Sequence, residues 1–425
     1  MRPSSCEWAP KALDFNTIEG VTQPMKIVSL FTGIGGLEAG LHRSGHNTLL
    51  TCEVWAPAVA VLEERFEGIE HHADVISLTT LPPETEVVTA GFPCQDLSQA
   101  GRTAGIQGQR SGLIEHVIRL IDNHHIPLVV LENVSFMLQL DRGAAMKWLT
   151  DSFTQRGYRW AYRTVNSLAF VPQRRERVFF IASKGDIDPA DVLFVDEVIP
   201  PDITTPLDTH AHGFYWTEGT RGLGWADDAI PTLKNGSTVG IPSPPAILLP
   251  DGNIIRPDIR DAERLQGFPV NWTKPAETVG RSSMRWSLVG NAVTVDVATW
   301  LGKRLASPGS YAGDRDMKES QIKQRKSGSS WPKAARSVNG RVVPVAINAF
   351  PAWKARKPLH QFLKYPGTPL SEKATAGFLS RAEASSLRFV PGFLDHVRSH
   401  LMKMRNGTGP ETDPVTALEA RSAAA

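Results

Sequence analysis

A cysteine follows a proline in residues 91–98, which read Gly-Phe-Pro-Cys-Gln-Asp-Leu-Ser. The proline fixes its own φ and favours an extended backbone in the residue before it. The β-branched run at residues 86–90 is typical of a strand. The thiol of Cys94 is therefore expected at the carboxyl end of a strand, where open α/β sheets bind their ligands. A lone cysteine is more often a small buried hydrophobic residue, and this is our interpretation of Cys6 and Cys52.

Eight short motifs lie in order between residues 25 and 306. They are Phe31-Thr-Gly-Ile-Gly-Gly-Leu-Glu-Ala-Gly40, Glu53, Asp74, Pro93-Cys94-Gln95, Glu132-Asn133-Val134, Gln173-Arg174-Arg175-Glu176-Arg177, Arg264-Leu265-Gln266-Gly267-Phe268-Pro269 and Gly290-Asn291-Ala292-Val293. Any one of them could arise by chance, but together and in this order they resemble the motifs of DNA (cytosine-5)-methyltransferases of the bacterial or phage restriction-modification type. The resemblance implies methylation of carbon 5 of cytosine within a specific sequence of double-stranded DNA, with S-adenosyl-L-methionine as methyl donor.

The glycine-rich motif favours this cofactor over a dinucleotide. A dinucleotide fingerprint has glycine at its first, third and sixth positions, and Gly33 and Gly35 fit the first two, but Glu38 stands at the sixth. A pyrophosphate is therefore not expected, and S-adenosylmethionine has none. Glu53, 18 residues after Gly35, could accept hydrogen bonds from two ribose hydroxyls, and Asp74 could accept one from the adenine amine. Together with the resemblance, this predicts the following cofactor-binding residues: Phe31, Gly33, Gly35, Gly36, Glu53, Val54, Asp74, Val75, Pro93, Leu113, Asn291 and Ala292.

The implied chemistry starts from the weak nucleophilicity of cytosine C5. Addition of the Cys94 thiolate at C6 would convert the ring into an enamine that can attack the methyl group. An acid that burial keeps neutral is needed at N3, and Glu132 ends an apolar run at residues 128–132. Arg175 and Arg177 alternate, so a strand would point both to one face. One of them is expected to orient Glu132 or bind cytosine O2, and the other to bind a phosphate. The ordinary alternative for Glu132 is a surface acid or a helix cap. The ordinary alternative for Arg175 and Arg177 is an exposed basic strand.

Contacts to DNA are expected from two further regions. The target base must be flipped out of the stack to be reached, and the glycines within residues 95–112 provide hinges that could close over it. An insertion at residues 199–258, rich in Pro, Gly, Thr and Asp, lies where the family has its target-recognition domain. The predicted DNA-binding residues are Gln95, Ser98, Arg110, Gln173, Thr232, Leu233 and Lys234. Ordinary turn chemistry is an equal alternative for those in the insertion.

The elements that must position these residues alternate along the chain. Strands are predicted at residues 25–31, 49–53, 86–90, 128–132 and 177–183, and helices at 37–44, 56–66, 258–265 and 293–305. This alternation predicts an α/β fold with a doubly wound, mostly parallel sheet, as in class I S-adenosylmethionine-dependent methyltransferases. The predicted domains are a lead-in (1–24), a catalytic and cofactor-binding domain (25–198), a small loop-rich target-recognition domain (199–258), a return to the catalytic domain (259–306), a basic linker (307–341), a basic C-terminal extension (342–405) and a disordered tail (406–425).

Composition and charge restrict the remaining classes. Three cysteines at unrelated spacings give no disulfide framework and no metal-binding pattern, and the chain has neither a membrane-spanning apolar run nor a signal peptide. A bacterial cytoplasmic monomer without metal is expected, with a cognate restriction endonuclease as a partner that forms no stable complex. The net charge is +2, yet residues 307–425 hold 19 Lys/Arg against 9 Asp/Glu and residues 1–306 hold 27 against 35. This asymmetry favours contact of the C-terminal part with DNA phosphates, and packing of its aromatic residues onto the catalytic domain is the alternative.

Two other functions fit the same motifs. A transfer RNA methyltransferase could use this scaffold, although the insertion and the basic tail favour DNA. A non-catalytic DNA-binding relative is disfavoured because Cys94, Glu132, Arg175 and Arg177 are all present. The recognition sequence stays open, and so does the stacking partner of the adenine, because Val54 and then Trp55 follow Glu53 where many relatives have an aromatic residue directly.

Overall fold

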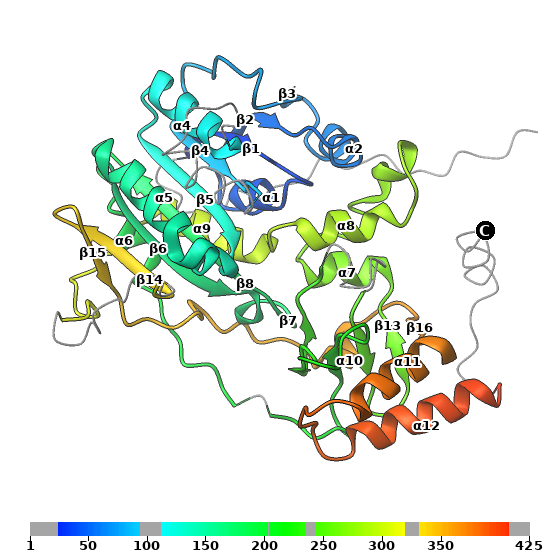
Figure 1. Cartoon of the computed structure of the whole chain (residues 1–425). Helices are drawn as coiled ribbons and strands as arrows, with labels where there is room; N and C mark the ends of the chain where they lie inside the picture. The colour runs from blue at the N-terminus through cyan, green and yellow to red at the C-terminus, as the bar shows by residue number, and fades with distance from the viewer. Residues whose placement is uncertain (1–23, 94–111, 203, 235–243, 319–330, 408–425) are drawn as a thin grey trace, which may run out of the picture.

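The main body of the molecule is a nine-stranded sheet with helices on both faces (Figure 1). The computed structural model describes residues 24–93, 112–202, 204–234, 244–318 and 331–407. In spatial order the strands are β15 (Arg341–Pro344), β14 (Ala334–Val338), β6 (Arg159–Asn166), β8 (Glu176–Ser183), β5 (Leu128–Val134), β4 (Val87–Ala90), β1 (Lys26–Leu30), β2 (Asn47–Cys52) and β3 (Glu70–His72). The strands from β3 to β5 are parallel, and the remaining four pair antiparallel. The predicted α/β class with a parallel core is confirmed.

Strand β1 illustrates how the sheet buries two faces. Val28 and Leu30 pack with Ile114 in one core cluster, whereas Ile27 packs with Leu301 in another. Successive side chains of a strand point to opposite faces, so a central strand covered on both sides is mostly apolar. One face is covered by α4 (Leu113–His124) and α5 (Ala144–Gln155), and the other by α1 (Gly36–His42), α6 (Pro189–Leu193) and α9 (Val295–Ala306).

Helix α4 shows why these segments are helical. Its buried residues Ile114, Val117, Ile118 and Ile121 recur at the three- and four-residue spacing of one helix face. Burying each such side chain stabilises the fold by roughly 1.5–3 kcal/mol. The helix ends at His125, whose left-handed φ of 52° turns the chain toward β5.

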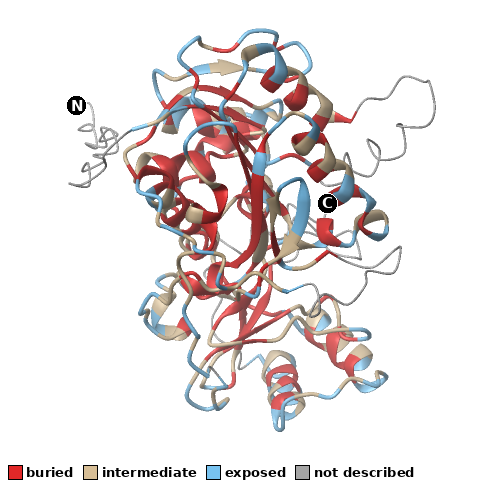
Figure 2. Cartoon of the chain, turned by 90° about the vertical axis from the view of Figure 1, so that its left-hand side faces the viewer, coloured by how far each residue is buried: buried red, intermediate tan, exposed pale blue. Residues whose placement is uncertain are grey.

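A smaller antiparallel sheet forms the second part of the molecule. Its order is β10 (Ala226–Asp227), β9 (His212–Phe214), β12 (Ala246–Leu248), β13 (Ile254–Arg256) and β16 (Thr368–Pro369). A two-stranded parallel ladder of β7 (Gln173–Arg174) and β11 (Ile230–Pro231) lies between the two parts. In Figure 1 the orange and red helices α11 (Glu372–Glu383) and α12 (Phe393–Arg405) lie beside this sheet. Buried residues follow the strands of both sheets and the inner faces of the helices (Figure 2).

The remaining elements connect these parts. They are α2 (Ala56–Arg65), α7 (Ile259–Leu265), α8 (Met284–Asn291), α10 (Leu359–Phe362) and the 3-10 turns η1 (Ser135–Leu138), η2 (Leu140–Gly143), η3 (Ser167–Ala169) and η4 (Lys274–Thr278). Among the described helices, none is long and apolar enough to cross a membrane. The predicted lead-in and tail lie almost wholly outside the described residues.

The C-terminal third differs most from the sequence prediction. Residues 307–341 were expected to form a linker, but β14 lies within them and pairs with β6 of the main sheet. Asn339 (φ 49°) and Gly340 (φ 74°) join β14 to β15. Asn-Gly is the residue pair that tight hairpin turns prefer, because both positions need a left-handed backbone. This local signal was missed because the surrounding sequence is rich in Ser, Lys and Arg.

Candidate active site

A cavity of about 580 Å³ opens at the carboxyl ends of the parallel strands. It is lined by residues that follow β1, β2, β4 and β5 and by the start of α4 and the end of α8. The predicted cofactor-binding residues on its wall are Phe31, Gly33, Gly36, Glu53, Val54, Asp74, Val75, Pro93, Leu113, Asn291 and Ala292. Glu132 and Arg177 lie on the same wall.

The glycine loop turns the chain from β1 into α1. Phe31 has a left-handed φ of 55°, an uncommon backbone for a residue with a side chain. Gly33 is also left-handed (φ 58°), and among the described residues no atom lies within 4 Å of where a Cβ would stand. At Gly36 a Cβ would lie 2.4 Å from the carbonyl oxygen of Val293, so glycine lets the start of α1 approach the residues after α8. The loop therefore leaves open space beside Gly33, whereas at Gly36 it packs tightly against the residues after α8.

Gly35 has a packing role in addition to the one predicted. Its φ is 76°, and a Cβ there would lie 2.2 Å from Cε2 of Phe66. The residue caps α1 in a left-handed conformation against an aromatic ring, which favours glycine. Gly35 is not among the residues on the cavity wall, and its contact with the cofactor stays a prediction.

The carboxylate of Glu53 holds the loop in place. Its Oε2 accepts a hydrogen bond from the amide of Gly33 (2.8 Å), and its Oε1 accepts from the amides of Val54 (3.0 Å) and Trp55 (2.9 Å). A carboxylate has about four acceptor sites, and three are used here, so Oε2 can still accept a hydrogen bond from one ribose hydroxyl. Asp74, at the next strand end, accepts from the amide of Ile76 (2.9 Å).

Apolar side chains flank these two acids. Val54 is 72% exposed and Ile76 is 54% exposed, and both line the cavity. Large exposed aliphatic groups beside carboxylates suit a ligand with a flat apolar ring and a polar sugar. The residues present therefore fit the adenosyl group of S-adenosylmethionine. Trp55 packs partly against the core around α2 and also lines the cavity.

Asn133 fixes the segment that leads to the predicted nucleophile. Its Nδ2 donates to the carbonyl of Phe92 (2.9 Å), and its Oδ1 accepts from the amide of Val134 (2.8 Å). Pro93 is the last described residue of this segment, and Cys94, Gln95, Ser98 and Arg110 lie outside the described residues. The sequence prediction assigned no role to Asn133 beyond its place in a motif. Its adjacency to Glu132 is the signal that could have identified it as a residue of the site.

Glu132 and Arg177 form a nearly buried ion pair on adjacent strands. Nε of Arg177 lies 3.1 Å from Oε1 of Glu132, and their side chains are 14% and 9% exposed. Strands β5 and β8 are antiparallel neighbours, which brings these residues together. Burial raises the pKa of Glu132, and the nearby arginines oppose this rise only in part. Glu132 is thus suited to act as a proton donor, with Arg177 orienting it.

Arg175 does not share the cavity with Arg177. Its side chain is fully buried, with Nη1 donating to the carbonyl of Leu233 (3.1 Å) and Nη2 donating to the carbonyl of Ala292 (2.7 Å). Burial lowers the pKa of this guanidinium. Residue 175 lies between β7 and β8 rather than within a strand, so the alternation that predicted one shared face does not apply. A phosphate contact by Arg175 is therefore ruled out in this conformation.

Three predicted DNA-binding residues take part in the same internal network. Gln173 is fully buried; its Nε2 donates to the carbonyl of Leu265 (2.9 Å), and its Oε1 accepts from the amide of Leu233 (3.0 Å). Leu233 is buried as well, and Oγ1 of Thr232 donates to the carbonyl of Arg174 (2.9 Å). The predictions of Gln173 and Leu233 as DNA contacts are therefore corrected. Both residues hold the segment that follows β11 against α7 and the main body. The prediction failed because a sequence pattern alone cannot tell a buried amide from an exposed one.

Lys234 is exposed, as a DNA-binding residue must be. Its Nζ lies 2.6 Å from Oε1 of Glu218 and 3.6 Å from the ring centroid of Tyr215. The prediction of Lys234 as a DNA contact is compatible with this position.

Glu38 lines the cavity, although the sequence motifs assign it no role. The side chain is buried and lines the cavity floor, with Oγ of Ser29 donating to its Oε1 (2.6 Å). Burial raises the pKa of Glu38 to about 7, although the hydrogen bonds from Ser29 and Thr89 lower it. The signal in the sequence was an acid at the place where a dinucleotide fingerprint has its third glycine.

The fold is an α/β sheet with a parallel core, and the cavity at its strand ends fits S-adenosylmethionine. The crystal structure of the S. pombe Dnmt2 methyltransferase aligns with a TM-score of 0.47 and 16% identity, over 66% of this chain and 98% of that one. The type II methyltransferase M.MspI of Moraxella sp is 24% identical over 310 residues, which are 68% of this chain and 72% of that protein.

Two findings assign the family. Residues 25–214 match the family described as C-5 cytosine-specific DNA methylase. The type II methyltransferase M2.BsuMI of Bacillus subtilis (strain 168) is 44% identical over 371 residues, which are 84% of this chain and 93% of that protein. The chain belongs to the C-5 cytosine-specific DNA methylase family, so it is a DNA (cytosine-5-)-methyltransferase whose cofactor is S-adenosylmethionine.

Proposed function

We propose that this enzyme methylates cytosine within one specific sequence of double-stranded DNA, by base flipping and a covalent adduct between Cys94 and C6. The observation that carries the proposal is the Glu132–Arg177 pair (3.1 Å) on the wall of the cofactor cavity. The same wall includes Gly91, Phe92 and Pro93, the three residues that precede Cys94 in the sequence. An acid with a raised pKa and a cation therefore lie on the cavity wall beside the segment that leads to the proposed nucleophile.

The residues divide the reaction among themselves. The Cys94 thiolate forms a bond to C6, and the electron pair of the C5–C6 double bond moves to make C5 nucleophilic. Glu132 donates its proton or a hydrogen bond to N3, so no bare ring anion accumulates. When bound, S-adenosylmethionine would supply an electrophilic methyl group to C5 and leave as S-adenosylhomocysteine. Loss of the C5 proton to solvent water, with return of any N3 proton to Glu132, then restores the double bond and expels the thiolate from C6.

The wider setting is proposed from the same relatives. The relatives M2.BsuMI and M.MspI are both named type II methyltransferases, which supports a restriction-modification role, with a cognate endonuclease that forms no stable complex. We place the enzyme in the bacterial cytoplasm as a monomer that acts on duplex DNA. The family match favours DNA over transfer RNA as substrate.

Bisulfite sequencing of DNA from a host without cytosine methylation tests this proposal. Expression of the wild-type chain should protect cytosine at one sequence from conversion, and Cys94→Ser should abolish the protection. A duplex with 5-fluorocytosine at the mapped target should trap a covalent complex with the wild type, because fluorine blocks the final elimination. A trapped complex with Cys94→Ser as well would show that another residue is the nucleophile.

A further inference from the structure

Two segments far apart in the sequence build the smaller sheet. Strand β16 pairs antiparallel with β13, with Pro369 opposite Ile255 and Thr368 opposite Arg256. The amide of Leu370 also donates to the carbonyl of Ile254 (2.9 Å). The segment after residue 358 therefore completes the sheet of the recognition insert and is no separate appendage.

The two segments also share one core. Phe214 of β9 lies with its ring centroid 5.1 Å from that of Phe378 and 5.1 Å from that of Phe393. All three side chains are fully buried. Because Phe378 belongs to α11 and Phe393 to α12, the two helices form the apolar cover of the recognition sheet.

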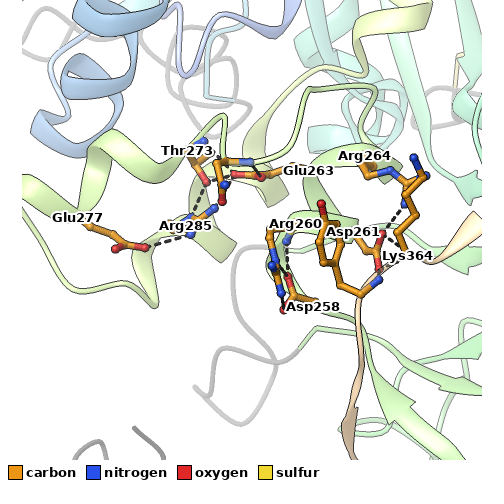
Figure 3. A network of polar contacts seen from close by, with 11 residues as sticks. Asp258, Arg260, Asp261, Glu263, Arg264, Thr273, Glu277, Arg285 and Lys364 are labelled. Carbon is orange, nitrogen blue, oxygen red and sulfur yellow. Dashed lines mark hydrogen bonds and ion pairs between the residues drawn. The ribbon is translucent and has the colours of Figure 1, made fainter. Parts of the chain in front are cut away.

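Polar contacts fasten the start of this C-terminal segment to α7 (Figure 3). The carboxylate of Asp261 accepts from the amides of Lys364 (3.0 Å) and Tyr365 (2.9 Å). Nη1 of Arg264 donates to Asp261 (2.5 Å) and to the carbonyl of Phe362 (2.7 Å). Asp261 is fully buried, so these hydrogen bonds form in a low-dielectric site and fix the segment firmly.

Arg381 of α11 reaches out of this cover to a neighbouring loop. Its Nη2 donates to the carbonyl of Trp216 (2.8 Å), and its Nε donates to the carbonyl of Glu218 (3.1 Å). Gly219 follows with a φ of 121°, and a Cβ there would lie 3.4 Å from the Phe378 ring. The conformation of the loop at residues 216–219 is thus set by α11.

The loop in turn fixes Lys234. Oε1 of Glu218 lies 2.6 Å from Nζ of Lys234, and this Nζ stands over the ring of Tyr215. The Tyr215 hydroxyl donates to the carbonyl of Thr232 (2.8 Å), which fixes the ring. The exposed Arg174 lies beside the same segment, because it pairs with Pro231 in the β7–β11 ladder and its carbonyl accepts from Oγ1 of Thr232 (2.9 Å). Arg174 and Lys234 are therefore two exposed cations on the edge where the two parts of the molecule meet.

We propose that Arg381 is a positioning residue for DNA recognition, which holds Lys234 in place through Glu218 so that it meets the duplex. The inference rests on the proposed function, because it requires that duplex DNA lies along the edge formed by Arg174 and Lys234. It gives the C-terminal segment a role in target recognition that its charge alone did not predict. Arg381 acts through the loop and does not itself touch the reacting atoms.

The test compares five variants of the full chain with the wild type, two of which are Lys234→Ala and the double variant Arg381→Met with Lys234→Ala. Arg381→Met keeps the aliphatic stem and removes the hydrogen bonds, and Arg381→Lys keeps one cationic donor. Arg398→Met is the matched control, because Arg398 lies on α12 and forms exposed ion pairs with Glu383 and Asp395. Each protein is assayed for methylation of the mapped duplex and of duplexes with one mismatched base pair, for binding of S-adenosylhomocysteine and for melting temperature.

Arg381→Met should raise KM for the mapped duplex by about tenfold, the scale of one lost charge-assisted hydrogen bond. The discrimination against mismatched duplexes should fall, while kcat and S-adenosylhomocysteine binding stay at wild-type values. Arg381→Lys should recover part of the loss, and Arg398→Met should behave as the wild type. The double variant Arg381→Met with Lys234→Ala should be no worse than Lys234→Ala alone, because the two residues act in one chain of contacts.

Two outcomes would overturn the inference. Arg381→Met could lower the melting temperature with KM and discrimination unchanged, which would make Arg381 a purely structural residue. The effects of Arg381→Met and Lys234→Ala could add, which would separate the two residues. A wild-type chain that methylates no duplex would instead refute the proposed function itself, so the two failures are distinguishable.

Discussion

At the scale of single residues, Glu132 combines burial with a neighbouring cation. Burial raises its pKa, while Arg177 at 3.1 Å limits the rise. Glu132→Gln keeps the shape of the side chain but cannot supply the proton that N3 needs. We expect kcat to fall by roughly 10²-fold or more, the usual scale of general acid catalysis, with little change in DNA affinity.

Single-turnover methylation and gel-shift titration measure these two effects separately. Glu176→Gln is a suitable control, because Glu176 is a nearby acid that pairs with Lys333 at the surface. Wild-type turnover in Glu132→Gln would show that another group activates the ring.

Glu38 leads to a prediction about stability and pH. Its pKa is raised from 4.5 to about 7 in the folded protein, so folding favours the protonated form. The penalty for burying an ionised Glu38 is absent below pH 4.5, where Glu38 is protonated in the unfolded chain as well, so the folded protein has its full stability there. This stability is lost as pH rises from 4.5 through about 7. The loss amounts to about 3 kcal/mol in the free energy of unfolding. Glu38→Gln should remove this contribution, so urea unfolding at pH 5 and pH 8 should differ less in the variant than in the wild type. An identical pH dependence in both proteins would contradict a raised pKa at Glu38.

At the scale of elements, the parallel strand ends bring the cofactor residues together. Glu53 follows β2 and ties down the amide of Gly33 after β1, so its loss affects both the ribose site and the loop. Glu53→Ala should weaken S-adenosylhomocysteine binding by about tenfold or more, the equivalent of one or two lost hydrogen bonds to a charged group. Turnover at saturating cofactor should change less, because the reacting methyl group is at the other end of the ligand.

Isothermal titration with S-adenosylhomocysteine measures this loss. Glu64→Ala on the exposed side of α2, where Glu64 pairs with Arg65, is the matched control. Unchanged affinity in Glu53→Ala would mean that the ribose binds elsewhere.

At the scale of the whole molecule, the basic C-terminal third links both sheets. It adds β14 and β15 to the main sheet and β16, α11 and α12 to the smaller one. Several of its cations serve internal contacts, among them Lys354 with Asp296, Arg405 with Glu372 and Arg381 with two backbone carbonyls. The observed packing favours the structural role of its aromatic residues over the phosphate-binding role that charge alone predicted.

Truncation after Ala306 should therefore destabilise the protein. It would expose Phe214 and the other apolar residues that α11 and α12 cover. We expect loss of solubility or a fall in melting temperature, measured by circular dichroism. Truncation after Gly407 is the control, because it removes none of the described contacts. A soluble truncated chain with the wild-type melting temperature and a flatter salt dependence of DNA binding would restore the phosphate-binding interpretation.

The sequence by itself determined the α/β class, the strand-end positions of Glu53, Asp74 and Glu132, and the family. These follow from properties that are local in the chain: apolar runs, glycines before a helix, and short motifs in a fixed order. Only the tertiary structure decided that Arg177 faces the cavity while Arg175 and Gln173 are buried between the two parts. It also decided that Gly35 packs on Phe66 and that the C-terminal segment completes the smaller sheet. These outcomes depend on contacts between residues far apart in the chain, such as Arg175 with Ala292 and Ile255 with Pro369, and local patterns carry no record of such contacts.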